Sequence, residues 1–120
     1  MKTALVVFAH GSRVAEANES VEKLTAEVAR EGGFDLFEAA FLDLAKPDLP
    51  GAVACLAARG ATRVVIVPHF VILGVHLQRD LPRMVEELSR SYPGVRIEVK
   101  PPLEGHPGLR SILLDRALGR

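Results

Sequence analysis

Histidine side chains in this sequence follow short aliphatic segments, at positions where a parallel sheet places its functional groups. His10 comes directly after the apolar run Leu5–Phe8. His69 and His76 follow the apolar run Val64–Val67. Because the carboxyl ends of parallel strands meet at one edge of a sheet, and ligands of open α/β sheets bind outside that edge, we expect these imidazoles on one side of the molecule.

A carboxylate completes a candidate metal site at the same edge. Asp43 ends another strand-like segment, and His106 follows the fourth. Neutral imidazole and carboxylate suit borderline divalent ions such as cobalt, nickel, iron or zinc. The residue types therefore predict a metal site built from His10, Asp43 and His76. The alternative at each position is ordinary: a loop histidine is often solvated or structural, and an aspartate at a strand end is often a turn residue.

Two other chemistries fit the loop after the first strand less well. Neither G-x-G-x-x-G nor G-x-x-x-x-G-K-[ST] follows that strand, although His10-Gly-Ser-Arg13 could present backbone amides to an anion at a helix start. Ser12 lacks the G-x-S-x-G turn that exposes the nucleophile of a serine hydrolase. Metal chemistry is favoured over phosphate binding and over acyl transfer.

Four aliphatic segments alternate with four helix-like segments, which predicts a βαβαβαβα chain. The expected strands run from about Thr3 to Phe8, Phe34 to Leu42, Arg63 to Val67 and Val95 to Val99. The first and third are continuous apolar runs, as in central strands covered on both faces, whereas the second and fourth interleave charges and fit edges. We therefore expect an α/β fold: a four-stranded parallel sheet of order 2-1-3-4 with helices on both faces.

Apolar spacings of three and four residues mark the inner faces of the helices. The residues expected to point inward are Val14, Ala17, Val21, Leu24 and Val28, then Leu49, Val53 and Leu56, then Leu81, Met84, Val85 and Leu88, and finally Leu109, Ile112 and Leu113. Ser12 is expected to cap the first helix. After a loop over Pro68 to His76, Asp80 is expected to cap the third helix, with Pro82 in its first turn.

Length and composition exclude several classes of protein. The chain has 120 residues, 48% of them hydrophobic, which predicts one domain over residues 1–120. Lysine plus arginine and aspartate plus glutamate both number 15, so no basic surface for nucleic acid is expected. The single cysteine, Cys55, excludes an intrachain disulfide and is expected to be buried. No segment reads as a signal peptide or a membrane span, and a cytoplasmic location is expected.

Four segments together resemble a known family. They are His10-Gly-Ser-Arg13, Phe41-Leu-Asp-Leu-Ala-Lys-Pro-Asp48, Val67-Pro-His-Phe-Val-Ile-Leu-Gly-Val-His-Leu-Gln-Arg-Asp-Leu-Pro82 and Pro102-Leu-Glu-Gly-His-Pro107. In this order and spacing they resemble the short-form sirohydrochlorin chelatases of the CbiX type, which are similar to one half of the two-domain class II tetrapyrrole chelatases. The resemblance implies a chelatase-like fold and insertion of Co²⁺, or next Fe²⁺, into sirohydrochlorin on a route to cobalamin or sirohaem. It also implies a homodimer and no tightly bound cofactor, the metal being a substrate.

The resemblance also implies roles for individual residues. The catalytic, metal-handling histidines fall on His10 and His76, and which of them binds metal and which accepts pyrrole protons stays open. Asp43 stands where the family usually has glutamate, and its shorter side chain holds the carboxylate one methylene further back. His69 stands where an aromatic or aliphatic residue is usual, which favours a packing role.

The remaining predicted site residues are expected to bind the macrocycle. The apolar loop through Phe70 and Leu73 offers a flat wall, and arginines suit the carboxylates of the ring. The predicted substrate-binding residues are Ser12, Arg13, Phe70, Leu73, Gly74, Arg79 and His106, and Arg83 is a further candidate partner for a carboxylate. His106 could line the rim of the pocket or order its own turn.

Two other classes of function stay open from the sequence. A carrier that holds metal or tetrapyrrole without turnover would use the same residues. A nucleotide-binding signalling module of flavodoxin-like fold would need an acidic cluster or a phosphate loop where His10-Gly-Ser-Arg13 stands. The residue types do not separate cobalt, iron and nickel as the metal, because affinities of first-row ions follow their own order in most sites.

Overall fold

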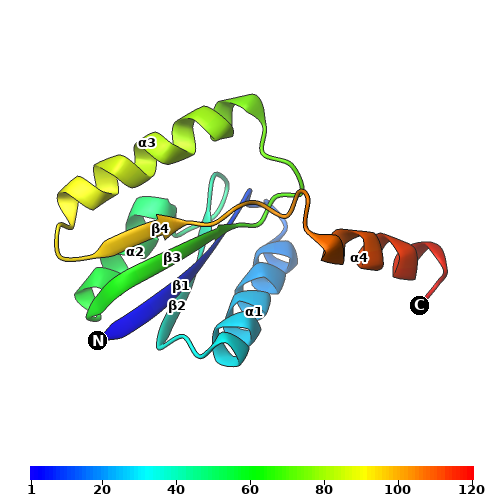
Figure 1. Ribbon diagram of the computed structural model, residues 1–120, viewed down its shortest axis with the longest axis horizontal. Helices are drawn as coiled ribbons and strands as arrows, with labels where there is room; N and C mark the ends of the chain where they lie inside the picture. The colour runs from blue at the N-terminus through cyan, green and yellow to red at the C-terminus, as the bar shows by residue number, and fades with distance from the viewer.

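The computed structural model describes all residues from Met1 to Arg120, and its strands form one parallel sheet. The elements in chain order are β1 (Lys2–Ala9), α1 (Ala15–Gly32), β2 (Leu36–Phe41), α2 (Leu49–Ala58), β3 (Ala61–Pro68), α3 (Val75–Ser91), β4 (Arg96–Val99) and α4 (Pro107–Ala117). The order across the sheet is β2-β1-β3-β4, which confirms the predicted topology. Helices lie on both faces of the sheet (Figure 1).

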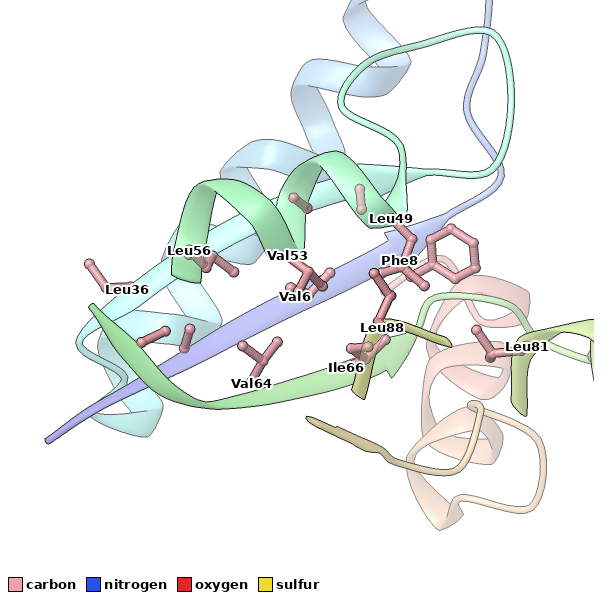
Figure 2. Packing of buried hydrophobic residues seen from close by; sticks show 14 of the residues in the cluster. Val6, Phe8, Leu36, Leu49, Val53, Leu56, Val64, Ile66, Leu81 and Leu88 are labelled. Carbon is pink, nitrogen blue, oxygen red and sulfur yellow. The ribbon is translucent and has the colours of Figure 1, made fainter. Parts of the chain in front are cut away.

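The apolar runs of β1 and β3 form the centre of the sheet, as their composition predicts. Val6 pairs with Ile66, and every β1 residue from Ala4 to Ala9 is buried. Figure 2 shows Val6, Val64 and Ile66 facing the helices on one side of the sheet. Because strand side chains alternate between faces, the neighbouring residues Leu5 and Val7 of β1 point to the opposite face.

Helices α2 and α3 together cover the face of the sheet on which Val6, Val64 and Ile66 lie. The predicted inner residues of α2, Leu49, Val53 and Leu56, are all buried, and Asp48 caps the helix by accepting a hydrogen bond from the Gly51 amide at 2.8 Å. On α3, Leu81 and Leu88 are buried and Met84 and Val85 are half-buried, as predicted. The main core therefore lies between the sheet and these two helices (Figure 2).

The prediction for α1 is wrong in two respects. Val14, not Ser12, occupies the N-cap position, and the Ser12 hydroxyl instead accepts a hydrogen bond from the Val14 amide at 3.0 Å. The residues of α1 that are buried are Thr25 and Ala29, whereas of the expected inner residues only Val21 is half-buried. The physical reason is that α1 stands alone beside β1 and β2 on its face of the sheet, so part of its apolar stripe has no neighbour.

The start of α3 is also earlier than predicted. Gly74 is its N-cap and Val75 its first residue, so His76 lies in the first helical turn, and Asp80 and Pro82 lie inside the helix. A proline inside a helix removes one backbone hydrogen bond. Burial of Leu77, before the proline, and Leu81 against the sheet offsets that loss and keeps the helix continuous.

The last helix does not pack inward as predicted. None of the residues of α4 is buried, and Leu113 is 69% exposed. Figure 1 shows α4 extending away from the sheet toward the C-terminus. The apolar spacing of Leu109, Ile112 and Leu113 is real, but the face that it marks has no partner within this chain.

The prediction that Cys55 is buried is wrong. Its thiol is exposed and lies 3.5 Å from the Oε1 atom of Glu38. The buried face of α2 consists of Leu49, Ala52, Val53 and Leu56, and Cys55 lies beside that face rather than on it. Separately, none of the helices is both long enough and apolar enough to span a lipid bilayer.

Candidate active site

The loops after β1 and β2 are joined through their backbones at the carboxyl edge of the sheet. The Leu42 amide donates to the carbonyl oxygen of Ala9 at 2.8 Å, and the Asp43 amide donates to the carbonyl oxygen of His10 at 3.0 Å. These bonds continue the β1–β2 pairing past the last strand residues. His10 and Asp43 are therefore adjacent, as the topology predicts.

Gly11 makes this close approach possible. Its φ is +94°, a conformation that residues with a side chain rarely adopt, and a Cβ atom there would overlap the carbonyl oxygen of Asp43. A glycine is therefore required between His10 and Ser12, and this requirement is visible only in the structure. It lets the first loop lie directly on the second.

The His10 ring is exposed and supported from one side. Its Nδ1 atom lies 3.3 Å from the carbonyl oxygen of Gly11, and its ring meets that of Phe70 edge to face, with centroids 6.5 Å apart. Phe70 in turn packs against Phe8 of the core, with the ring centroids 5.9 Å apart. With Nδ1 protonated and donating to the carbonyl, the lone pair of Nε2 is free, which is the arrangement seen in metal-binding histidines.

His76 is held differently. It is exposed in the first turn of α3, and its Nδ1 atom lies 3.2 Å from the Nη2 atom of Arg79. A guanidinium can only donate, so this contact requires an unprotonated Nδ1 and places the proton of the neutral ring on Nε2. His10 and His76 therefore present different nitrogen atoms in this arrangement.

The Asp43 carboxylate is partly engaged by its own loop. Its Oδ1 atom accepts a hydrogen bond from the Leu44 amide at 2.8 Å, and Leu44 has a φ of 66°. Asp43 is exposed, so its second carboxylate oxygen can accept a further hydrogen bond. A turn role and a ligand role are compatible at this residue.

The three predicted metal residues share one edge of the sheet without forming a closed cage. No three or more histidine, cysteine, aspartate or glutamate side chains in the chain are grouped so that they could hold one metal ion. His10, Asp43 and His76 are all exposed. The structure therefore does not group the side chains of His10, Asp43 and His76 as one metal site, in contrast to the prediction from the residue types.

The loop between β3 and α3 presents an apolar surface beside His10. Phe70 and Leu73 are half-buried, whereas Val71 and Ile72 point to solvent. Val75, which was not among the predicted site residues, is 78% exposed.

Leu73 also lines a larger apolar groove between α3 and the segment after β4. The groove has a volume of about 600 Å³, and its other walls include Leu77, Leu81, Val99 and Pro102. Leu73 belongs both to the β3–α3 loop and to the wall of this groove. An apolar surface therefore continues from the loop along α3.

The other predicted residues occupy varied positions. Ser12 is fixed by Asn18, which sequence reasoning missed: the Asn18 side chain accepts from the Ser12 amide at 2.9 Å and donates to its carbonyl at 2.8 Å. Arg13 is exposed. His106 is the N-cap of α4, with its Nδ1 atom accepting from the Gly108 amide at 2.8 Å.

His69 is turned toward the other face of the sheet. Its amide donates to the Phe8 carbonyl at 2.7 Å, and its half-buried side chain lines a small groove beside α1. His69 therefore lies apart from the surface formed by His10 and the β3–α3 loop.

The CbiX family model matches residues 4–119. The chain belongs to the CbiX family. It is 30% identical to a sirohydrochlorin cobaltochelatase of Methanopyrus kandleri, over 94% of this chain and 93% of that protein.

Solved structures share the fold of this CbiX chain. A CbiX protein from Marinobacter aquaeolei VT8 superposes with a TM-score of 0.82 at 29% identity, covering 98% of this chain and 95% of that one. The cobalt complex of the sirohydrochlorin chelatase SirB from Bacillus subtilis superposes with a TM-score of 0.75 at 26% identity, covering 85% of this chain and 44% of that one. This CbiX chain thus corresponds to somewhat less than half of the SirB chain.

Proposed function

We propose that this protein inserts a divalent metal ion, Co²⁺ first and Fe²⁺ second, into sirohydrochlorin. The observation that carries the proposal is the placement of two exposed histidines beside one partly exposed apolar loop: the His10 ring meets Phe70, and His76 follows the loop in the first turn of α3. The family to which the chain belongs supports the choice of reaction. In the reaction, one metal ion replaces two pyrrole protons, and no electron or nucleotide is exchanged.

His10 is the residue that first meets the metal ion. Its Nδ1 atom is engaged by the Gly11 carbonyl, which leaves the lone pair of Nε2 for a metal ion or a pyrrole proton. Asp43, joined to His10 through the backbone, supplies a carboxylate oxygen nearby. A site with so few protein donors holds the ion weakly enough to release it into the macrocycle.

His76 becomes available when substrate binds. Its Nδ1 atom accepts from Arg79 in the absence of a ligand, and a carboxylate of the macrocycle is a better partner for that guanidinium. Once Arg79 turns to the carboxylate, Nδ1 of His76 is free to accept a pyrrole proton. Histidine suits this role because it gains and loses protons near neutral pH.

The macrocycle is bound by an apolar wall and polar ends. Phe70 and Leu73 with the exposed residues between them face the ring, and Gly74 lets the ring approach the start of α3. Arg13 and Arg79 meet carboxylates of the ring. The remaining assigned contacts are with Ser12 and His106. A single four-stranded sheet offers one wall of a cleft, so the proposed working form is a homodimer.

The test is anaerobic incubation of the protein with sirohydrochlorin and Co²⁺, Fe²⁺ or Ni²⁺ in turn, with the absorbance followed against a mixture without protein. Many equivalents of metallated product per chain are expected, fastest with Co²⁺. His10→Ala and His76→Ala should each lower the rate by at least about 100-fold. Arg90→Ala, at the far end of the helix that carries His76, serves as the control and should keep the rate.

Two outcomes would reject the proposal. Rates equal to those of the protein-free mixture with all three metals would remove the enzymatic activity. A single equivalent of product per chain, with no further turnover, would identify a carrier of metal or tetrapyrrole instead. Circular dichroism of each variant separates loss of the site from loss of the fold.

A further inference from the structure

One side chain of α1 binds both backbone groups of Ser12, in the loop that carries His10. The Oδ1 atom of Asn18 accepts a hydrogen bond from the Ser12 amide at 2.9 Å, and its Nδ2 atom donates to the Ser12 carbonyl oxygen at 2.8 Å. Asn18 is half-buried and lies in the first turn of α1. These two bonds tie the start of the helix to the loop after β1.

The residue type matters at this position. The side-chain amide of asparagine has an acceptor and a donor side by side, so it can pair with an amide and a carbonyl of the same residue. A carboxylate would keep the acceptor and lose the donor, and an aliphatic side chain would lose both. The position therefore selects a side chain that reads the backbone of Ser12.

The Ser12 amide belongs to the same peptide group as the Gly11 carbonyl. This peptide bond is trans, so its N–H and C=O point in opposite directions and fixing one of them fixes the other. On the carbonyl side, the Gly11 oxygen lies 3.3 Å from the Nδ1 atom of His10. A continuous line of contacts thus runs from the His10 ring through one peptide group to Asn18.

The loop has a separate anchor on its other side. The Asp43 amide donates to the His10 carbonyl oxygen, and Gly11 lies directly against the Asp43 carbonyl. Neither contact fixes the rotation of the peptide that follows Gly11, and glycine is the residue with the greatest freedom of rotation. The contacts with His10 and Asn18 are the only hydrogen bonds that this peptide makes, so Asn18 is the anchor that sets its orientation.

The orientation of this peptide decides which nitrogen atom of His10 carries the proton. A carbonyl oxygen can only accept, so its contact with Nδ1 requires a proton there and leaves the lone pair on Nε2. Hydrogen bonds in series polarise one another, so the bond from the Ser12 amide to Asn18 makes the Gly11 carbonyl a stronger acceptor.

We infer that Asn18 is a positioning residue for His10: it holds the Gly11–Ser12 peptide so that the proton of the neutral ring stays on Nδ1 and Nε2 stays open. The use of Nε2 for a metal ion or a pyrrole proton belongs to the proposed function, on which the effect of Asn18 on activity rests. The effect of Asn18 on the ring itself needs neither metal nor sirohydrochlorin.

Nuclear magnetic resonance of the histidine rings tests this effect directly. Long-range ¹H–¹⁵N spectra of the full chain, labelled with ¹⁵N at its histidines, show which ring nitrogen carries the proton at about pH 8.5, where histidine side chains are neutral. The signals of His10 are those lost in His10→Gln. His76 and His106 are internal controls, because the Nδ1 atom of each accepts a hydrogen bond and the proton belongs on Nε2.

In the wild-type chain we expect the proton of His10 on Nδ1. Asn18→Ala should shift both nitrogen signals of His10 toward those of a ring with mixed tautomers, while alanine preserves α1. Asn18→Leu, which keeps the volume and removes both bonds, carries the same expectation. Asn18→Asp keeps the acceptor for the Ser12 amide and should keep the proton on Nδ1. Glu19→Ala, at the next and exposed position of α1, is the matched control.

Steady-state rates of metal insertion give the second readout. Asn18→Ala should lower kcat/KM for Co²⁺ by about tenfold, the usual cost of losing a group that orients a metal-binding histidine, with KM for sirohydrochlorin changed by less than about twofold. Asn18→Asp and Glu19→Ala should both stay close to the wild-type values. Circular dichroism of each variant checks that the fold is kept.

Three results would overturn this role of Asn18. One is an unchanged His10 tautomer in folded Asn18→Ala or Asn18→Leu, and another is loss of the tautomer in Asn18→Asp as well. The third is an effect confined to KM for sirohydrochlorin, which would place Asn18 behind the contacts of Ser12 with the macrocycle. If the tautomer responds as expected but the wild-type chain metallates nothing, the chelatase activity is rejected and the control of His10 by Asn18 stands.

Discussion

Arg79 and His76 lie one helical turn apart on α3, with the Nη2 atom of Arg79 3.2 Å from the Nδ1 atom of His76. Arg79 also lies 3.5 Å from the Asp80 carboxylate, an exposed pair of little consequence for stability. The contact with His76 matters more, because it occupies the nitrogen atom that would otherwise accept a proton. In the proposed reaction the macrocycle competes with His76 for this guanidinium.

Arg79→Ala is therefore expected to raise KM for sirohydrochlorin by about tenfold, the size of a lost charge-assisted hydrogen bond, with a smaller change in kcat. Initial rates over a range of sirohydrochlorin concentrations measure both constants. Arg90→Ala, whose exposed pair with Glu86 lies further along the same helix, is the matched control and should change neither. A fall in kcat with an unchanged KM would show that Arg79 acts on His76 and not on the substrate.

Gly11→Ala should destabilise the fold by about 2–4 kcal/mol, because the new Cβ would both strain a left-handed backbone and overlap the Asp43 carbonyl. Urea unfolding measures the loss. Gly94→Ala is the control, since a Cβ there meets open space, and a change within about 0.5 kcal/mol is expected. Equal effects of the two substitutions would contradict the close contact between the first and second loops.

Glu98 gives the fold a specific sensitivity to acid. Hydrogen bonds from Arg63 are the largest cause that lowers the pKa of the Glu98 carboxyl from 4.5 to about 2; burial opposes the lowering, and Lys100 and Arg96 add to it. Arg63 binds both carboxylate oxygens, at 3.1 and 3.0 Å. Because the unfolded carboxyl titrates near 4.5, the stabilisation is complete above that pH and is lost as the pH falls toward about 2.

Glu98→Gln should accordingly lower Tm by a few degrees at pH 7, and the difference from the wild-type chain should shrink as the pH falls from about 4.5 to about 2. Thermal unfolding followed at several pH values measures this. Glu86→Gln, in an exposed pair with Arg90, should have little effect at any pH. A gap between Glu98→Gln and wild type that is constant across this range would count against the lowered pKa.

His106 combines a capping role with a proposed contact to substrate, and two substitutions separate them. The side chain of asparagine can accept a hydrogen bond from the Gly108 amide as the imidazole does, whereas that of alanine cannot. His106→Asn should keep the amides of the first α4 turn protected from hydrogen exchange, and His106→Ala should lose that protection. Both should raise KM for sirohydrochlorin between about two- and tenfold. An unchanged KM in His106→Asn would leave the imidazole with the capping role only.

The strand order and the central strands follow from the sequence because they depend on local composition. Continuous apolar runs such as Val64–Val67 must be covered on both faces, and charges at Glu38 and Glu98 suit edge strands, so the pattern of each segment specifies its place. The same reasoning placed His10 and Asp43 at one edge of the sheet. The structure confirms this adjacency through the bond between their backbones.

The start of α3, the exposure of Cys55 and the direction of α4 were decided only by the tertiary structure. Whether an apolar stripe is buried depends on which neighbour covers it, and the spacing of Leu109, Ile112 and Leu113 carries no information about that neighbour. The helix containing Pro82 begins at Val75 because packing of Leu77 and Leu81 on the sheet outweighs the local preference of proline for a first turn. Residue pattern thus determined the strand order and the central strands, whereas long-range packing determined which apolar helix faces are buried.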